Sequence, residues 1–557
     1  MAKKGEKQRS KSAGPRSKSK AEFRGQVQAE VVDQLLHRFV ALVKHGLELM
    51  LRDPSELARQ EFRQHPDLVY TVEEIPVLVL GAAAGAYELP WPAFCQHVLT
   101  HPQWAELLGV TTQADLDRLA GGFDRCPIRI IELAVHDGLK EGDKQDLRPV
   151  EQRPSVQAEN AKYIRITLVL KLLKKRLRSF LNRLDQCDTK RPRHRPRIHR
   201  SRSFVLADLA RWILGLQSTD ALIRELEQNS DLAGAVNFRP DEIPSKATFS
   251  RRRMAVPLAD LQAILHELVA VLVRCKVIAG RAWVVDLTRV PTNSSVSKTY
   301  PDRPNGKSDP EAAFCGYADN DGGFQLGYCL VWIVDFKTEL PFALVFGGGN
   351  AQDSPLTQPL LEQACAEHPQ LARRCEYFIG DGGYDTLAIF NFILTRLRAL
   401  PAITKNPRNA PDPAADLATD ALCVLRRRSP LYMALFHSRT SVERANSWAK
   451  LTFNLKYHKQ RGWHAVQHCV LFAAIAMLCV AWVAVKTGHP DKIRLARTWI
   501  SRHLSDGVAQ LRCVTPTALW GCRLLPGVSN RSTAHLTSTG AHRIRRHTLP
   551  VVGRVLA

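Results

Sequence analysis

The sequence lacks the cysteine patterns that define disulfide scaffolds and zinc modules. Its 13 cysteines contain no C-x-x-C pair and no regular framework, so we expect free thiols, as in a reducing cytosol. Few histidines are spaced as metal ligands usually are. His464 and His468 are four apart on an expected helix, but two histidines supply only half of a zinc site. We therefore expect no zinc site of Cys and His residues.

Targeting and membrane segments are also missing from the pattern. Residues 1–20 carry eight Lys/Arg among Ser and Gly, with no apolar run behind them, so we expect no signal peptide. One uncharged run, Cys469 to Val485, has seventeen residues, which is short for a bilayer crossing. We expect a buried core helix there, and a cytoplasmic protein.

Acidic residues are scarce relative to basic ones. There are 54 Asp/Glu against 78 Lys/Arg, which gives a formal net charge of +24. This excess predicts a polyanionic partner, with nucleic acid first and an anionic membrane surface second. The charge is concentrated: Lys162–Arg202 holds fifteen Lys/Arg and two Asp, and Asp491–Ala557 holds eleven and two.

The length of 557 residues corresponds to roughly three domains. Composition and charge suggest the following division: a disordered basic arm at 1–24, a helical region of unknown role at 25–160, a basic helix and linker at 161–202, a helical DNA-binding domain at 203–279, an α/β catalytic domain at 280–488, and a basic C-terminal tail at 489–557.

The region 203–279 is expected to be helical. Two short helices, the second capped by Ser218, precede a capped and basic helix start at Pro244–Arg253. This order is compatible with a helix-turn-helix-like DNA reader, in which Arg251, Arg252 and Arg253 contact DNA. A small helical bundle with a solvated basic face explains the pattern equally well.

From residue 280 strands alternate with helices. Ala282–Val285 predicts a buried strand that ends at Asp286, followed by strands at 326–334 and 340–346. A helix at 354–367, a strand at 376–379 that runs into Asp381, a helix at 386–400 and a strand at 402–404 come next. The last helix of this series carries Glu443.

The segment from Phe436 to Lys450 has an ordered spacing. In a helix, Arg439 and Glu443 are four apart on one face, and Lys450 lies two turns further on that face. One carboxylate flanked by two cations suits an enzyme that holds a metal with the acid and phosphates with the bases. A solvated helix with an ordinary ion pair is the alternative.

These residues resemble a known family. The order of elements, with Asp286 and Asp381 on two strands and Glu443 on a helix, resembles the RNase H-like core of DDE transposases. Phe436, Arg439, Glu443 and Lys450 resemble the Tyr-x2-Arg-x3-Glu-x6-Lys signature of bacterial insertion-sequence transposases, with Phe in place of Tyr. Gly380–Asp385 resembles their Asp-x-Gly-Tyr-Asp segment. The resemblance covers about 200–490.

The resemblance implies a fold and a site. In that core the first and fourth strands are neighbours, so Asp286 and Asp381 meet and Glu443 completes the site. Two Mg²⁺ ions, or Mn²⁺ in their place, would be bridged by Asp286, while Asp381 and Glu443 each complete one. Asp385 is the rival second ligand, but we expect it to cap the following helix.

Further contacts and partners follow from the same interpretation. We expect Arg439, Lys450 and Phe436 near the cleaved phosphate, and Lys456, Lys459 and Arg461 along the DNA backbone. The partners would be double-stranded DNA, as terminal inverted repeats and target, and a second copy of the chain, in a nucleoid-associated complex without a membrane. The predicted function is transposition. The alternatives are an inactive DNA-binding regulator, an RNase H-like nuclease without strand transfer, and a basic membrane-associated protein.

Overall fold

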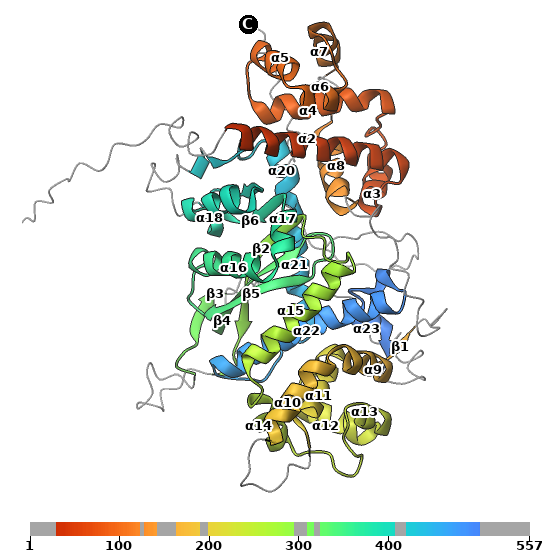
Figure 1. Cartoon of the computed structure of the whole chain (residues 1–557), viewed down its shortest axis with the longest axis vertical. Helices are drawn as coiled ribbons and strands as arrows, with labels where there is room; N and C mark the ends of the chain where they lie inside the picture. Colours follow the sequence, from red (N-terminus) through yellow and green to blue (C-terminus); the bar gives the residue numbers. More distant parts are fainter. Residues whose placement is uncertain are drawn as a thin grey trace, which may run out of the picture.

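Three groups of elements are stacked along the long axis of the molecule (Figure 1): N-terminal helices, a mixed sheet with its helices, and a second helical group. The computed structural model describes residues 29–122, 127–141, 163–189, 199–294, 309–316, 324–406, 419–420 and 422–501. The expected basic arm, most of the linker at 190–202 and the tail beyond Ser501 lie outside these residues.

The N-terminal helices form a compact layer around the long helix α2 (Ala29–Arg52), which packs on α8 (Ile128–Glu141) and α4 (Ile75–Tyr87). The apolar stripe of α2 is buried there because it recurs at helical spacing. The smaller elements are α3 (Glu56–Gln64), η1 (Val72–Glu74), α5 (Trp91–Thr100), α6 (Pro102–Leu108) and α7 (Gln113–Ala120).

The second helical group follows a short strand, β1 (Ile164–Arg165). Its helices are α9 (Ile166–Arg176), α10 (Arg178–Thr189), α11 (Ser201–Ile213), α12 (Thr219–Gln228), α13 (Ser230–Ala235), α14 (Lys246–Met254) and α15 (Leu258–Arg274). The basic helix expected after residue 161 is two helices that meet at Leu177. The predicted caps are present: Ser218 and Ser245 accept from the backbone N–H groups of Ala221 and Thr248.

The sheet has six strands: β2 (Ala282–Pro291), β3 (Ala313–Gly316), β4 (Phe324–Asp335), β5 (Pro341–Gly348), β6 (Tyr377–Gly380) and β7 (Leu400–Ile403). The path β3-β4-β2-β6-β7 has β5 paired to β4 in addition. The expected adjacency of the first and fourth strands is confirmed, because β2 pairs with β6 in parallel. β3 was not predicted.

Helices and helical turns connect the later strands of the sheet and follow its last strand. They are α16 (Asp353–Glu367), α17 (Pro369–Arg374), η4 (Gly382–Tyr384), α18 (Leu387–Phe392), η5 (Ile393–Leu397), α20 (Pro430–Phe436), η7 (His437–Arg439), α21 (Thr440–Ser447) and η8 (Trp448–Thr452). After α22 (Trp463–Lys486) come η9 (Pro490–Lys492), α23 (Ala496–Trp499) and β8 (Ile500–Ser501), which pairs with β1. α20 packs on α8 and α4 and so joins the N-terminal helices to the segment that carries Glu443.

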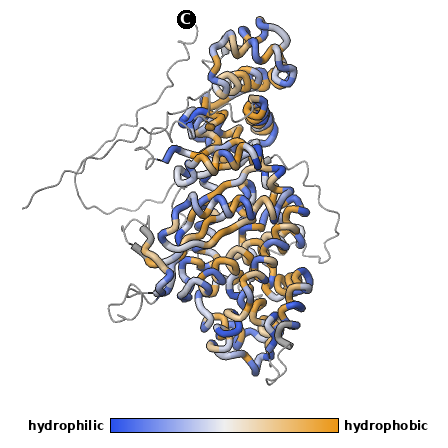
Figure 2. The backbone as a smooth tube through the Cα atoms, turned by 60° about the vertical axis from the view of Figure 1, so that its left-hand side comes forward, coloured by the Kyte–Doolittle hydropathy of each residue, from blue (hydrophilic) through white to orange (hydrophobic). Residues whose placement is uncertain are grey.

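Helix α22 lies between the sheet and the second helical group (Figure 1), and hydrophobic stretches of the backbone run through the middle of the molecule (Figure 2). It is long and apolar enough to cross a membrane, but 94% of its most apolar window is buried inside the protein. The prediction of a core helix is confirmed. α22 packs against α11, α15 and β5, so the second helical group and the sheet share one apolar core. The domain division expected from the sequence stays a prediction.

Candidate active site

The strand register brings the two aspartates together. Val284 on β2 is the partner of Ile379 on β6, and two further residues along each parallel strand lead to Asp286 and Asp381. Neighbouring strands are about 4.8 Å apart, so these residues lie side by side. The sequence interpretation expected the strand to end at Asp286, but it does not. β2 continues to Pro291 with β4 as its partner, and only its pairing with β6 stops before Asp286.

The segment η7–α21 places Arg439 and Glu443 over this point. Arg439 pairs with Glu443, as the four-residue spacing predicted, and its Nη1 lies 3.5 Å from Asp286 Oδ1. One guanidinium thus links the strand carboxylate to the helix carboxylate. Asp286, Asp381 and Glu443, the three predicted acids, therefore converge from two strands and one helix.

The pKa of Asp286 reflects its burial first and its charged neighbours second. Burial raises the pKa of Asp286 to about 7. Arg439 opposes this rise in pKa, while the carboxylates of Asp381, Glu443 and Asp353 add to it. Acidic oxygens that repel one another in a partly dry site are the donor set that suits a hard divalent cation such as Mg²⁺. The residues present therefore fit the expected metal ions.

Two groups around Asp286 were missed by the sequence interpretation. Asn446 Nδ2 donates to Asp286 Oδ2 at 2.8 Å, and Trp332 Nε1 donates to Asn446 Oδ1 at 2.8 Å. This chain fixes the orientation of the carboxylate. Asn446 lies three residues after Glu443, a helical spacing that could have revealed it. Trp332 is the cross-strand partner of Asp286 on β4.

The fourth acid, Asp353, is the first residue of α16. Its carboxylate occupies the space where a side chain at Gly383 would begin, and it raises the pKa of both Asp286 and Tyr384. Glycine at 383 is required by this close approach. No sequence pattern points to Asp353, because it lies 67 residues from Asp286 in an otherwise ordinary helix start.

Asp385 has another role than the one expected. The N-cap of α18 is Thr386, whose side chain accepts from Ile389 N. Asp385 is instead fully buried, pairs with Arg427 and accepts from Asn406 N at 2.9 Å. The carboxylate is thus held by structural partners, which favours Asp381 as the residue that faces the other acids.

Phe436 and Lys450 flank the site along the chain. Phe436 ends α20, where its ring stacks on Tyr432 with centroids 6.1 Å apart, and the Arg439 guanidinium lies 6.0 Å from the Phe436 ring. The ring therefore orients Arg439 without a hydroxyl. Lys450 is half-buried on η8, whose i→i+5 turns rotate it away from its place on a straight α-helix.

The loop after η8 carries the expected backbone-binding residues. Lys459 and Arg461 are exposed and Lys456 is half-buried. The loop is tied to the end of β2, since Asn293 N donates to Gln460 O at 2.9 Å. Tyr457 is 45% exposed beside these cations. An exposed aromatic ring among cations is available for a base or a sugar.

The three arginines of α14 do not share one surface. Arg253 is 3% exposed, and its Nε donates to Asp208 Oδ2 at 2.6 Å. Arg252 is 8% exposed and bonds Ser201 Oγ at 3.1 Å. Only Arg251 faces solvent. Burial in ion pairs and hydrogen bonds leaves Arg252 and Arg253 little surface to offer DNA, which argues against the DNA contacts expected for them.

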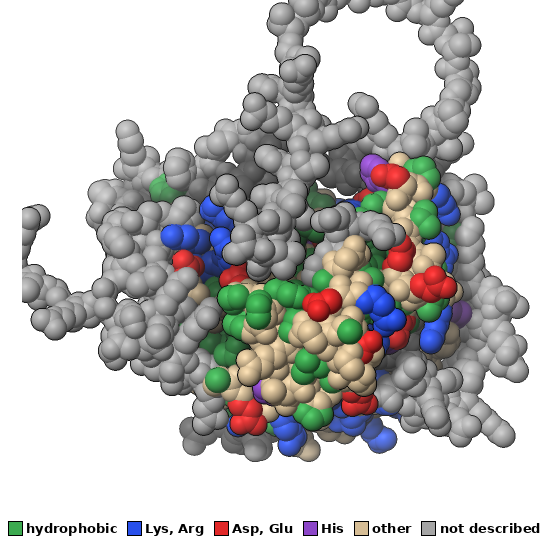
Figure 3. All heavy atoms as spheres, turned by 90° about the horizontal axis from the view of Figure 1, so that it is seen from above, with side chains coloured by type: hydrophobic (Ala, Val, Ile, Leu, Met, Phe, Trp, Pro, Cys, Tyr) green, Lys and Arg blue, Asp and Glu red, His purple; other side chains and the backbone are tan. Residues whose placement is uncertain are grey.

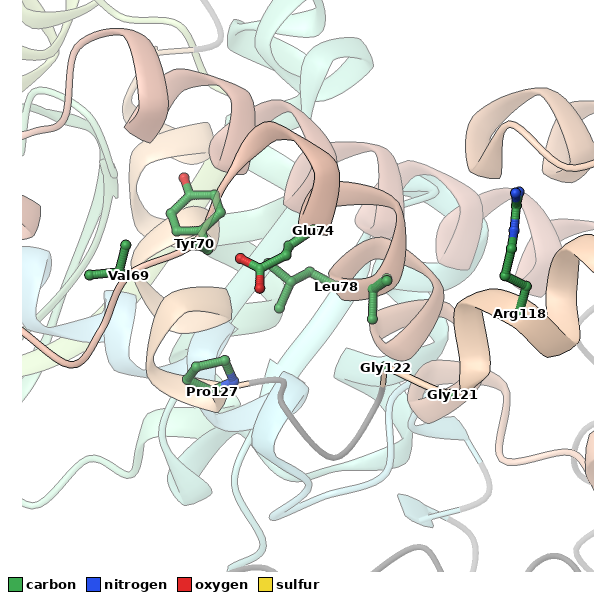
Figure 4. Close-up of a pocket in the computed structure, with 9 residues that line it drawn as sticks. Val69, Tyr70, Glu74, Leu78, Arg118, Gly121, Gly122 and Pro127 are labelled. Atoms are coloured by element: carbon green, nitrogen blue, oxygen red, sulfur yellow. The ribbon is translucent and has the colours of Figure 1, made fainter.

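Two hollows lie away from the acids. One, of about 640 Å³, lies between α2 and the residues near Arg427. The other, of about 290 Å³, lies among the N-terminal helices and is lined by Tyr70, Glu74 and Arg118 (Figure 4). Its polar groups are engaged: Tyr70 donates to Leu47 O, and Glu74 accepts from Thr71 N. Neither hollow contains the convergent carboxylates.

The fold and the site have a defined form: a mixed sheet in which the neighbouring strands β2 and β6 bring two aspartates under a helical glutamate. Residues 281–479, which carry this sheet and the three acids, match the family model described as transposase DDE domain, and the mixed sheet is consistent with the RNase H-like fold of such a domain. No curated protein and no solved structure matches the chain.

Proposed function

We propose that the protein is a transposase that binds the terminal inverted repeats of a mobile element, cuts the DNA at those ends and joins them to target DNA. The observation that carries the proposal is the meeting of Asp286, on β2, and Asp381, which directly follows β6, beneath Glu443. Two Mg²⁺ ions held by these acids would activate the attacking oxygen and stabilise the leaving oxygen.

The chain's own residues supply the rest of the site. Asn446 and Trp332 hold Asp286 in one orientation, and Arg439 is placed between two acids, where it can turn to a phosphate. The scissile phosphate would approach over η7–α21, and the exposed Lys459 and Arg461, on the loop tied to the end of β2, are further cations for the DNA backbone. In-line displacement at a phosphodiester needs this combination of acids and cations.

The distribution of charge indicates which part of the protein would bind DNA. Residues 29–141 contain 17 Asp/Glu and 9 Lys/Arg, a net charge of −8, whereas Lys162–Arg202 contains fifteen Lys/Arg and two Asp. Seen from the N-terminal end, acidic and basic side chains are interspersed (Figure 3). We infer that DNA lies along the sheet and second helical group, with Arg251 among its contacts, and that two copies of the chain bind the two ends in a cytoplasmic complex.

The test is a cleavage and joining assay with the full-length chain. The DNA should carry the inverted repeats that flank the gene, with Mg²⁺ and a supercoiled target. Release of the ends followed by covalent joining supports the proposal. Cutting without joining would identify a nuclease, and binding without cutting would identify an inactive regulator, so either result would reject strand transfer.

The cations near Glu443 give a second measurable effect. Arg439→Ala and Lys450→Ala should each slow cleavage and reduce the salt dependence of DNA binding by about one phosphate contact. Arg444→Ala is the matched control on α21, because Arg444 pairs with Glu339, which keeps Arg494 as a partner. Equal salt slopes and rates for all three variants would reduce Arg439 and Lys450 to surface ion pairs.

The pKa of Asp286 predicts a cost in stability without metal. Since its folded pKa of about 7 lies above the value near 3.9 in an unfolded chain, its stabilising contribution is complete below about pH 4 and is lost as the pH rises through 7. In EDTA at pH 8, Asp286→Asn should therefore be more stable than the native chain by roughly 2–4 kcal/mol.

Melting curves at pH 4.5 and pH 8, with EDTA and with Mg²⁺, measure this effect. The difference between the two proteins should be small at pH 4.5, and Mg²⁺ should stabilise the native chain more than the variant at pH 8. A native chain that is as stable as Asp286→Asn at pH 8 in EDTA would show that the site carries no excess negative charge.

A further inference from the structure

A second group of metal-ligating side chains lies at the far end of α16 from the acids. His266 of α15, Glu367 at the end of α16 and His368 at the junction with α17 each offer a ligand atom, and these atoms all lie within 4.8 Å of one another. α16 begins at Asp353 and ends at Glu367, so its two ends are roughly 20 Å apart at 1.5 Å per residue. The cluster is therefore separate from Asp286 and Asp381.

The His266 ring lies between the other two ligand groups of the cluster. His266 Nδ1 lies 3.3 Å from His368 Nε2, and His266 Nε2 lies 3.0 Å from Glu367 Oε2. Two ring nitrogens that face each other need a shared proton or a cation between them. A tetrahedral ion with bonds of 2.0–2.1 Å separates neighbouring ligand atoms by about 3.3–3.4 Å, which is the spacing of the two nitrogens. Glu367 faces the other nitrogen of the His266 ring, so its side chain would have to turn to reach an ion bound at His266 Nδ1.

The surroundings fix the ligands in this orientation. His368 is 2% exposed, and its ring also hydrogen-bonds the backbone of Phe342 on β5. Gln363 Nε2 donates to both carboxylate oxygens of Glu367 at 3.2 Å. A ring held by a backbone group and a carboxylate held by an amide are the outer contacts that metal ligands usually have. The carboxyl end of α16 adds negative potential.

We propose that His266, Glu367 and His368 form a zinc site that fastens α15 of the second helical group to the α16–α17 junction of the catalytic sheet. Two imidazoles and one carboxylate suit Zn²⁺, whereas Mg²⁺ prefers an all-oxygen set. The side chains of His266 and Glu367 are 23% and 31% exposed, which gives the ion an entry path and leaves room for a water ligand.

The test uses the full chain with Zn²⁺ as the probe, in a background of Asp286→Asn, Asp381→Asn and Glu443→Gln, which removes the acidic centre. After equilibration with zinc and desalting, this protein should retain about one zinc ion per chain by mass spectrometry of the metal. Zinc should raise its melting temperature by roughly 5 °C or more. Co²⁺ in place of zinc should give the strong visible absorption of a tetrahedral site.

His266→Gln and Glu367→Gln should abolish the retained zinc, the thermal shift and the cobalt spectrum. Both positions are partly exposed, so these variants should remain folded in the absence of zinc. His464→Gln is the matched control, because His464 is an exposed histidine on α22. Retention of equal zinc by the Gln variants at 266 and 367, or no retained zinc in the background protein, would overturn the proposal. A shared proton would then account for the nitrogen pair.

Discussion

Asp286→Asn, Asp381→Asn and Glu443→Gln should each lower metal-dependent cleavage by at least about 10²–10³-fold, the scale of removing a group that acts on the reacting atoms. DNA binding measured without metal should change little, because the amides keep the shape of each side chain and these acids bind no phosphate directly. The measurement is single-turnover cleavage of a labelled repeat end, with binding followed on the same DNA by gel shift at fixed salt.

Asp385→Asn is the informative comparison for Asp381. Its carboxylate is buried against Arg427, so the amide should reduce stability by about 1–3 kcal/mol through the lost charged hydrogen bonds, while Arg427 keeps Asp420 as a partner. Cleavage per folded molecule should remain. If Asp381→Asn kept near-normal cleavage, while folded Asp385→Asn lost it, the second metal ligand would be Asp385. Asp353→Asn should give an intermediate loss of cleavage if its carboxylate contributes to the shared charge.

Substitution of Arg253 should mainly lower stability, whereas substitution of Arg251, in the same basic run, should mainly weaken DNA binding. Arg253→Ala should lower the free energy of unfolding by about 3 kcal/mol or more, because Arg253 is buried in an ion pair with Asp208 and bonds Thr219. Arg251→Ala, two residues earlier and exposed, should change stability by no more than about 0.5 kcal/mol and should weaken DNA binding with a smaller salt slope.

Denaturant unfolding followed by circular dichroism measures the first effect, and gel shifts over a salt series measure the second. Arg211 also contacts Asp208, with its Nε 3.0 Å from Oδ1, so one carboxylate serves two buried cations. Asp208→Ala should therefore cost at least as much stability as Arg253→Ala. If the Arg253→Ala protein kept native stability but bound DNA poorly, Arg253 would be a DNA contact and not a structural residue.

The sequence predicted most of the sheet but only part of what surrounds it. Continuous apolar runs locate β4, β5 and β6 to within two residues, because buried strands need continuous apolar side chains. The same signal locates the start of β2 but not its end at Pro291. The spacing of Arg439 and Glu443 predicted their pairing for a local reason: both lie on one helix. Asp286 and Asp381 could be brought together only through the resemblance to a family, since strand order is a long-range property.

What the sequence could not show depends on distant partners. A buried Arg253 and an exposed Arg251 look alike in a basic run, because the deciding group, Asp208, lies 45 residues away. Asp353 meets Asp286 only after the sheet has formed. His266 and His368 are 102 residues apart, which is why spacing rules that search for local ligand pairs do not find them.

The shared helix α22 has a consequence for damaged copies of the gene. It closes the core of both the sheet and the second helical group, and β8 at Ile500 pairs with β1 at Ile164. A product that stops before residue 463 lacks the helix on which the earlier segments pack, so its second helical group should not fold alone. If the chain is the transposase proposed above, frameshifted copies should therefore be inert and should not compete with the intact protein for DNA.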